Sequence, residues 1–231
     1  MRLGWTWLGR VGYEDAVARM ERLRARILDG DSSAETLLLL EHPATITMGR
    51  RTKPENLLAT PDELAARGVA LVRSSRGGDV TYHGPGQLVA YPVVRLGDGV
   101  VAHVERLAQA AVDVAAQHGV SARFDRDCPG VWTPDAKLAA IGVHVHRRVA
   151  IHGLALNVTT ALDHFALIVP CGLSNRRVTS IAAESHTTPD LPSVAAEFAA
   201  AFARLSGRTL RAVDPQIGAN ESLQSDRPSV E

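Results

Sequence analysis

The order in which helix and strand patterns follow one another limits this chain's fold more than any other feature of its sequence. The clearest helix pattern covers residues 101–118, where apolar residues form one stripe and Gly119 follows as a stop signal. Two more helices are expected, at 14–29 and from an N-cap at Ser193 to Leu205. Strand patterns lie between them, and the two kinds do not strictly alternate. This order argues against a doubly wound parallel sheet and predicts an α+β fold with a mixed, largely antiparallel sheet flanked by helices.

The expected strands are short apolar segments bounded by turn residues. They cover residues 3–8, 35–41, 69–73, 87–96, 129–133, 137–145 and 148–158, and a short helix is expected at 61–67. Pro92 within the fourth segment predicts an edge strand or a bulge, because proline cannot donate a ladder hydrogen bond. The last two segments can form a hairpin that turns at His146-Arg147.

The length and the charge limit the class of protein. A chain of 231 residues suits one large domain or two small ones, and no linker-like stretch interrupts residues 1–213, so one domain is expected. Residues 214–231 are polar and are expected to be a disordered tail. The formal net charge is zero and no basic run is present, which argues against a nucleic-acid or membrane-surface partner. The first residues lack the apolar stretch of a signal peptide, so we expect a cytoplasmic protein whose two cysteines are free thiols.

The two cysteines differ in their sequence neighbours. Cys128 lies beside Asp125 and Asp127, whose carboxylates disfavour a thiolate. Cys171 stands between a proline and a glycine, and two arginines follow at 176–177, which favours a reactive thiolate. Cys171 is therefore the candidate nucleophile, and a buried, inert thiol is the alternative.

Lys137 is notable because the chain avoids lysine. Of 25 basic residues only Lys53 and Lys137 are lysines, and lysine can lose its proton near neutral pH whereas arginine cannot. Lys137 lies in a segment of small apolar residues. If that strand is internal, Lys137 can share a proton with a nearby thiolate as a coupled pair; the alternative is an exposed lysine on an edge strand.

The segment Arg76–Gln87 contains four glycines and a proline, and allows tight turns and close approach to a ligand. Its backbone N–H groups could hold a phosphate or a developing oxyanion, or the segment could be a structural hairpin in which His83 is only hydrogen-bonded. Gly153, inside a strand pattern, indicates either close approach of a ligand or a bulge.

Two other kinds of catalytic site are disfavoured. The histidines at 144, 146 and 152 come without a C-x-x-C pair, so a zinc site is not expected. A serine hydrolase is disfavoured because no G-x-S-x-G elbow is present.

Taken in order, these motifs closely resemble those of the lipoyl(octanoyl) transferases, over residues 35–185. The segments that carry the resemblance are Leu40–Pro43 with Thr47 and Gly49, Arg76–Gln87, Tyr91-Pro92, Lys137–Gly142, His152–Asn157 and Pro170-Cys171-Gly172. Each motif alone is weakly specific, and the ordered set is highly specific.

The resemblance implies a fold like that of biotin and lipoate protein ligases and a transfer that needs no ATP, metal or other cofactor. An octanoyl group would pass from octanoyl-acyl carrier protein to a lysine of apo lipoyl domains, those of 2-oxoacid dehydrogenase E2 subunits and of the glycine cleavage H protein. A monomer is expected. Cys171 matches the acyl-accepting cysteine and Lys137 its partner lysine, whereas Cys128 and the tail match nothing functional. The residues that match the acyl site are Arg76, Gly77, Gly78, Asp79, Val80, Thr81, Tyr82, His83, Ala140, Ile141, Gly142, Gly153, Leu154 and Ala155.

Three other functions stay open at this point. An ATP-dependent lipoate or biotin ligase would share the fold and would not need a nucleophilic cysteine. A binding module would grip a carrier protein or a lipoyl domain without chemistry. A cysteine hydrolase would pass the acyl group to water.

Overall fold

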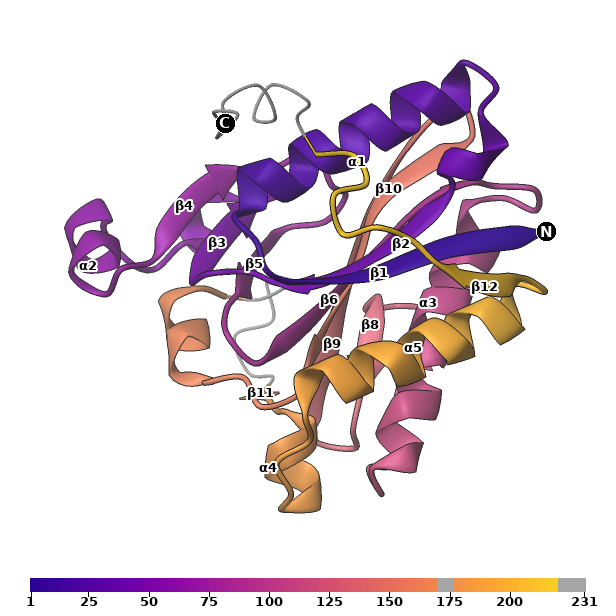
Figure 1. The fold of residues 1–231 in the computed structure, drawn as a ribbon. Helices are drawn as coiled ribbons and strands as arrows, with labels where there is room; N and C mark the ends of the chain where they lie inside the picture. The colour runs from indigo at the N-terminus through magenta and orange to yellow at the C-terminus, as the bar shows by residue number, and fades with distance from the viewer. Residues whose placement is uncertain (170–176, 220–231) are drawn as a thin grey trace, which may run out of the picture.

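One mixed sheet forms the centre of the computed structural model, which describes residues 1–169 and 177–219 (Figure 1). Its path runs β12-β1-β2-β6-β10-β9-β8-β7, and β11 adds to β9. The strands are β1 (Arg2–Arg10), β2 (Thr36–Glu41), β6 (Gln87–Arg95), β7 (Arg123–Asp125), β8 (Gly130–Trp132), β9 (Ala136–His146), β10 (Val149–Asn157), β11 (Arg177–Val178) and β12 (Thr209–Ala212). Pairs from β2 to β7 are antiparallel, whereas β1 is parallel to β2 and β12, and β11 to β9. The predicted mixed, largely antiparallel sheet is confirmed.

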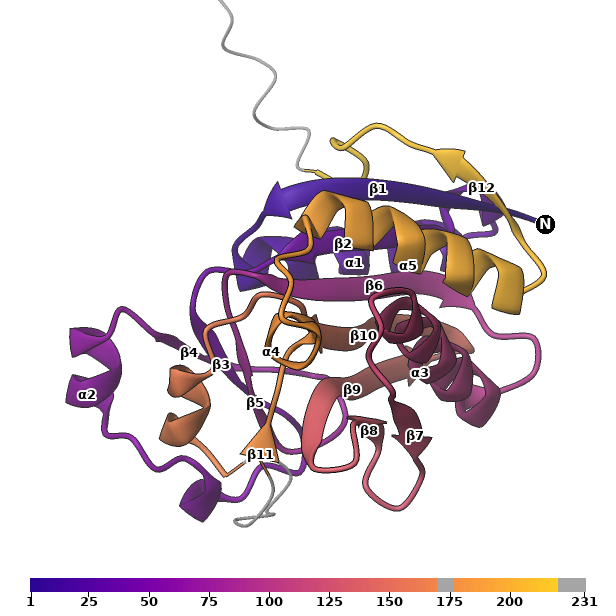
Figure 2. The same cartoon turned by 90° about the horizontal axis from the view of Figure 1, so that it is seen from below.

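Helices cover both faces of this sheet. Helix α1 (Tyr13–Leu28) lies on one face, and α3 (Val100–Gln117) and α5 (Leu191–Leu205) pack together on the other (Figures 1 and 2). The apolar stripe of α1 and the facing side chains of α3 and α5 are buried in two core clusters. Each fully buried leucine or phenylalanine in them contributes roughly 1.5–3 kcal/mol. Short helices α2 (Pro61–Ala66) and α4 (Ile181–Ser185) and the 3-10 turns η1 (Ser32–Ala34), η2 (Pro54–Asn56) and η3 (Asp163–Leu167) complete the connections.

The start of α5 differs from the expectation. Ser193 is not its N-cap, because the helix already begins at Leu191 and Asp190 is the cap. The Asp190 carboxylate accepts the backbone N–H of Ser193 at 3.2 Å and its hydroxyl at 2.8 Å. Pro192 fits the first turn of a helix, where its missing N–H costs nothing, and the helix starts three residues upstream of the expected position.

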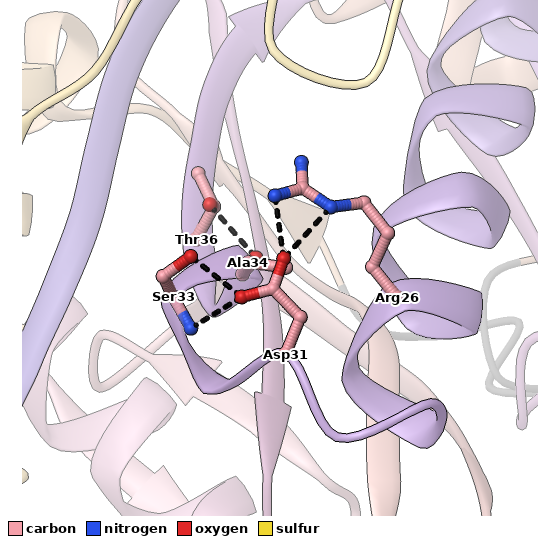
Figure 3. Close-up of polar contacts among 5 residues, drawn as sticks. All are labelled: Arg26, Asp31, Ser33, Ala34 and Thr36. Carbon is pink, nitrogen blue, oxygen red and sulfur yellow. Dashed lines mark hydrogen bonds and ion pairs between the residues drawn. The ribbon is translucent and has the colours of Figure 1, made fainter.

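A compact turn joins α1 to β2. Asp31 accepts the backbone N–H and the hydroxyl of Ser33, at 3.0 and 2.6 Å, and the guanidinium of Arg26 (Figure 3). These bonds, that to Ser33 above all, lower the pKa of Asp31. Thr36, the first residue of β2, donates its hydroxyl to the carbonyl of Ala34 at 3.0 Å and is fully buried. The turn thereby sets where β2 enters the sheet.

A second, smaller sheet stands at one end of the molecule, in the order β4-β3-β5 (Figure 1). Its strands are β3 (Thr45–Met48), β4 (Ala70–Arg73) and β5 (Val80–His83). Only β4 was expected from the sequence; β5 falls in the segment expected to be a loop. Strands of four residues next to glycines and prolines carry too little alternation to be recognised, and they are stabilised here by pairing with residues far away in the sequence.

Pro92 does not lie at an edge, since β6 is paired on both sides. It is in register with Leu37 of β2, and on the other side the β6–β10 ladder is interrupted between the pairs Val94–Ala150 and Ala90–Leu154. At this gap His152 has a φ of 59°. Its ring contacts Tyr13 and Tyr91 on the α1 face, although strand alternation would direct it to the other face. Of the two interpretations of Pro92, the edge strand is therefore wrong, and the proline marks a local irregularity of the strand pairing.

Gly153 follows this irregularity and is required by the neighbouring strand. A Cβ at this position would lie 2.1 Å from the carbonyl oxygen of Ala90. The close approach is thus made by the chain's own backbone, which supports the interpretation as a strand irregularity.

The hairpin of β9 and β10 is confirmed, with its turn one residue later than expected. His146 pairs with Val149, and the turn residues Arg147 and Arg148 both have positive φ, 46° and 65°. At the other end of the described chain, residues 214–219 lie along α1. Arg19 donates to the carbonyl of Pro215 at 2.7 Å, and Ile217 packs against the core beneath the helix. The expected disorder does not apply to residues 214–219, and residues 220–231 lie outside the described part.

Candidate active site

A cavity of about 280 Å³ opens where the small sheet meets β9 and β10. Its walls come from the 76–83 segment, from the N-terminal half of β9, from the second half of β10 and from residues 127–129, with Phe165 and Val178 at its edge. Its surface is mainly apolar. The volume lies just below the roughly 300–1,000 Å³ typical of small-molecule sites.

Most residues expected to bind substrate meet at this cavity. Those that line it are Arg76, Gly78, Asp79, Val80, Thr81, His83, Ala140, Ile141, Gly142, Gly153, Leu154 and Ala155. Gly77 and Tyr82 are not among its lining residues. Gly77 donates its N–H to the carbonyl of Val143 at 2.9 Å. The Tyr82 ring packs against Phe165 and His164 beneath the small sheet, where its hydroxyl contacts His164 Nδ1 at 3.0 Å.

Lys137 is buried at the cavity wall, with 6% of its surface exposed. It lies in β9 between β8 and β11, in register with Trp132 on one side and Val178 on the other. Its Nζ is 5.2 Å from the centre of the Trp132 ring, a cation–π contact. Gly130 has no side chain and so leaves space for the Lys137 side chain; a Cβ at position 130 would lie 2.7 Å from Lys137 Cε. The alternative of an exposed edge lysine is therefore wrong.

Cys171 lies outside the described residues, but the residues before and after its segment are anchored near the cavity. Val169 donates its N–H to the carbonyl of Asn56 at 2.8 Å, and η3 just before it carries the cavity residue Phe165. After the segment, Val178 lines the cavity and pairs with Lys137.

Cys128 also lies at the cavity, partly exposed, which its sequence neighbours did not indicate. Its backbone N–H donates to Asp125 Oδ1 at 3.1 Å, and its carbonyl accepts the Trp132 indole N–H at 3.0 Å. These bonds tie the 125–128 turn to the tryptophan that covers Lys137. Only the folded structure reveals this position, because the turn reaches the cavity through the pairing of β8 with β9.

Arg76 places a buried cation at the wall, with 8% of its surface exposed. Its Nε and Nη2 donate to Thr47 Oγ1 at 3.1 and 2.8 Å, and Nη2 also donates to the Thr47 carbonyl at 2.7 Å. Asp79 has a structural role at the same wall, because it accepts the N–H of Val80 at 2.7 Å and the side-chain amide of Asn56. The loop can thus present a positive charge and oriented dipoles to a bound group.

Three histidines, His42, His83 and His152, form a buried cluster in which His83 and His152 reach the cavity wall, with Tyr13 and Tyr91 between their rings. Burial lowers the pKa of His42 to about 4, and burial followed by the charge of Arg76 lowers the pKa of His152 to about 3. Burial, then His42 and Arg76, hold the pKa of His83 well below its usual value. At neutral pH these imidazoles are uncharged hydrogen-bonding groups.

Several lining residues were quoted in the sequence motifs without being assigned a role. Gln87, Tyr91, His152 and Asn157 all line the cavity. The even spacing of Gln87 and Tyr91 in one strand was a signal that these two share a face, whereas the position of His152 follows from the irregularity in β10 and could not be read from spacing.

A metal-ligand cluster and a membrane-spanning helix are both absent from the described part of the chain. Within 1–169 and 177–219 no three His, Cys, Asp or Glu side chains are grouped as metal ligands would be. Within the same ranges no helix has the length and apolar character needed to span a bilayer.

Comparison with known proteins gives consistent similarities. Residues 12–203 match the model of the lipoyl protein ligase A/B catalytic domain. The chain is 47% identical over 194 residues to a protein of Chloroflexus aggregans called octanoyltransferase, covering 81% of this chain and 87% of that one. It is 47% identical over 201 residues to the octanoyltransferase of Solibacter usitatus, covering 86% and 90%.

Solved structures show the same fold at lower identity. A lipoate-protein ligase A bound with ATP superimposes with a TM-score of 0.78 at 18% identity, covering 93% of this chain and 90% of that one. The biotin protein ligase of Aquifex aeolicus superimposes with a TM-score of 0.52 at 13% identity, covering 90% and 70%.

Proposed function

The chain belongs to the lipoyl protein ligase A/B catalytic-domain family, and we propose that it acts there as an octanoyltransferase in protein lipoylation. It transfers an octanoyl group from octanoyl-acyl carrier protein to a lysine of an apo lipoyl domain. The relatives that share almost half of its residues over most of their length support the acyl group and the reaction class. The proposal keeps the expected cytoplasmic location and monomeric state.

The observation that carries this proposal is the burial of Lys137 in the wall of a mainly apolar cavity, next to the strand that follows Cys171. Two residues span at most about 7 Å, so the Cα of Cys171 can lie no farther than that from the anchored Val169. The ammonium of Lys137 would stabilise a Cys171 thiolate, since an opposite charge nearby favours the charged form. The apolar wall would hold the acyl chain.

The proposed reaction has two steps. Cys171 Sγ attacks the thioester carbonyl carbon, a new C–S bond forms while the bond to the carrier sulfur breaks, and the carrier leaves as a thiol that has taken up the proton the cysteine gave up. The amine of the target lysine then attacks the acyl-enzyme, the C–S bond breaks, and the amine proton passes to Lys137, to the leaving Cys171 sulfur or to an intervening water. Arg76 and the backbone N–H groups of the 76–83 and 140–142 segments would stabilise the oxyanion in both steps. Exchange of one thioester for another followed by amide formation runs without a nucleotide.

Intact mass spectrometry tests this function. The chain is incubated with octanoyl-acyl carrier protein, with and without an apo lipoyl domain, and we expect an octanoyl adduct that disappears when the acceptor is added. Cys171→Ser should lose both the adduct and the transfer. Cys128→Ser, a cysteine change at the same cavity, should retain the adduct, and an adduct that depends on Cys128 instead would contradict the assignment.

The same experiment separates the alternatives. ATP-dependent modification of the acceptor without a cysteine adduct would indicate a ligase, whose fold the lipoate-protein ligase A shares. An adduct that decays to free octanoate at the same rate without acceptor would indicate a hydrolase. Tight association without any adduct would indicate a binding module.

A further inference from the structure

A chain of buried hydrogen bonds runs through the cavity wall, from Arg76 to the backbone of Lys137. Its side-chain members are Thr47, His83, Gln87 and Asn157, each at most 4% exposed. It joins the small sheet, which carries Thr47 and His83, to the β9–β11 wall, which carries Lys137. The reaction itself, as proposed above, assigns no role to Thr47, Gln87 or Asn157.

The orientations of the Gln87 and Asn157 side-chain amides follow from the backbone carbonyls that they face, because a carbonyl can only accept a hydrogen bond. Asn157 Nδ2 faces the carbonyl of Thr179 at 2.9 Å, and a carbonyl can only accept. Gln87 Nε2 likewise faces the carbonyl of Tyr82 at 3.2 Å. Asn157 Oδ1 must therefore accept from Gln87 Nε2, at 2.9 Å.

These orientations determine the protonation of His83. With its nitrogen committed to Tyr82 and Asn157, Gln87 presents Oε1 to His83 Nδ1 at 2.9 Å, so Nδ1 must carry the hydrogen. On the other side, Nε2 lies 3.5 Å from Thr47 Oγ1. That hydroxyl oxygen already accepts two N–H groups of Arg76, so its own hydrogen is directed at Nε2, which acts as the acceptor.

Every bond in the chain consequently runs in one direction. Arg76 donates to Thr47, Thr47 to His83, His83 to Gln87, Gln87 to Asn157, and Asn157 to the carbonyl of Thr179. The backbone N–H of Thr179 then donates to the carbonyl of Lys137 at 2.9 Å. Bonds aligned head to tail polarise one another, and a buried network of this kind holds its ends in a fixed relation. A second proton on His83 would place two donors against each other at Thr47, in agreement with its lowered pKa, which burial, His42 and Arg76 cause.

We propose that Thr47, Gln87 and Asn157 are positioning residues of the octanoyl transfer: they hold His83 as the neutral tautomer protonated at Nδ1 and fix Arg76 relative to Lys137. This proposal rests on the proposed function, because the two cations at the ends of the chain act on the same thioester, one on its oxyanion and the other on the sulfur. A free neutral histidine prefers the hydrogen on Nε2, so the unusual tautomer is a specific signature of the network.

Nitrogen NMR of the full-length chain with ¹⁵N-labelled histidine tests the tautomer without any substrate. His83 is assigned by comparison with His83→Gln. We expect a protonated Nδ1 and an unprotonated Nε2 throughout the neutral pH range. A His83 signal protonated at Nε2, or at both nitrogens, would overturn the proposal for the wild-type protein, whatever its variants do.

Kinetics test the positioning role. In Asn157→Leu and Thr47→Val we expect kcat for octanoyl transfer to fall roughly 10- to 100-fold, the size of effect that a displacement of about 1 Å can cause, with KM changed less than about 3-fold. Thr36→Val is the matched control, since Thr36 is as buried as Thr47 and donates one hydroxyl bond outside the network; its kcat should match the wild type.

The outcomes separate the two levels of proposal. A wild-type chain that transfers octanoyl while Asn157→Leu and Thr47→Val, both folded by circular dichroism, keep the wild-type kcat overturns the positioning role alone. A wild-type chain that forms no octanoyl amide overturns the proposed function, and the NMR signature then still decides whether the tautomer is held.

Discussion

Val178 lies in register with Lys137 in the parallel pair of β11 and β9, and the backbone N–H of the next residue donates to the Lys137 carbonyl. The chain therefore leaves the segment of Cys171 directly alongside the lysine proposed to act with it. A two-residue strand held to an internal strand in this way gives the lysine backbone little freedom to move away.

Replacing Lys137 should impair both proposed steps. We expect Lys137→Ala to slow octanoyl transfer by roughly 10²- to 10⁴-fold, the range for loss of a group that handles a proton, and to slow alkylation of Cys171 by iodoacetamide at pH 7. Peptide mapping measures alkylation at each cysteine separately. Lys53→Ala, the change of the other lysine, which is exposed, should behave like the wild type. Rapid alkylation of Cys171 in Lys137→Ala would contradict the proposed pairing.

A substitution at Gly130 can fill the space that the Lys137 side chain occupies while the lysine itself is left unchanged. In Gly130→Ala the new Cβ would lie 2.7 Å from Lys137 Cε and 2.8 Å from the carbonyl of Ala139, so the side chain or the strand must shift. We expect a loss of unfolding free energy of about 1–3 kcal/mol from overpacking and a clear fall in kcat. Gly97→Ala is the control, because among the described residues no heavy atom beyond its chain neighbours lies within 4 Å of the added methyl group. Equal activity of the two variants would show that the lysine position is not critical.

Gly153→Ala should destabilise the sheet itself. Its Cβ would lie 2.1 Å from the carbonyl oxygen of Ala90 and 2.9 Å from the ring of Pro92, two rigid groups of β6. Urea denaturation of this variant should show a midpoint well below that of the wild type, by more than the roughly 1–3 kcal/mol of ordinary overpacking. A variant as stable as Gly97→Ala would mean that β10 can move away from β6 freely.

Stability should fall on mild acidification because of histidines that are buried in the uncharged form. Burial above all lowers the pKa of His103 to about 4, whereas in the unfolded chain a histidine titrates near 6.5. The unfolded state then binds more protons between these values, so this contribution is complete above about pH 6.5 and declines as pH falls towards 4, by up to about 1.4 kcal/mol per pH unit. His103→Leu should reduce the drop in urea midpoint between pH 7 and 5.

The control for His103→Leu is the same substitution at an exposed histidine, His146→Leu, measured in the same urea denaturation experiment. It should retain the wild-type dependence on pH. Identical slopes for the wild type, His103→Leu and His146→Leu would show that His103 does not titrate in this window.

The sequence allowed good prediction of features that local periodicity determines. The stripe of α3, the hairpin of β9 and β10 and the class of sheet were all readable, because repeats of 3.6 or 2 residues persist there over many positions. The short strands β3, β5 and β12 and the place of Pro92 were not. They depend on pairing across the fold, as in the central position of β6 between β2 and β10.

The candidate site likewise has features that local sequence patterns predicted and features that depend on contacts across the fold. The burial of Lys137 was one of two alternatives that the sequence left open, and the expected substrate-binding residues of β9 and β10 line the cavity, where their role in binding stays a prediction. Tyr82 was misplaced because the strand character of β5 was missed, and with it the alternation that directs this ring to the core. The contributions of Cys128, Gln87 and Asn157 depend on which atoms face one another, which spacing alone does not determine.

The pairing of β12 with β1 has a consequence for synthesis of the protein. Trp5 and its neighbours emerge from the ribosome about two hundred residues before Thr209–Ala212, the partner strand at that edge. During that interval the nascent chain exposes an unsatisfied strand border, the kind of surface that recruits other polypeptides. A truncation that ends just before residue 209 should therefore yield insoluble material, even though all the residues that line the cavity are encoded.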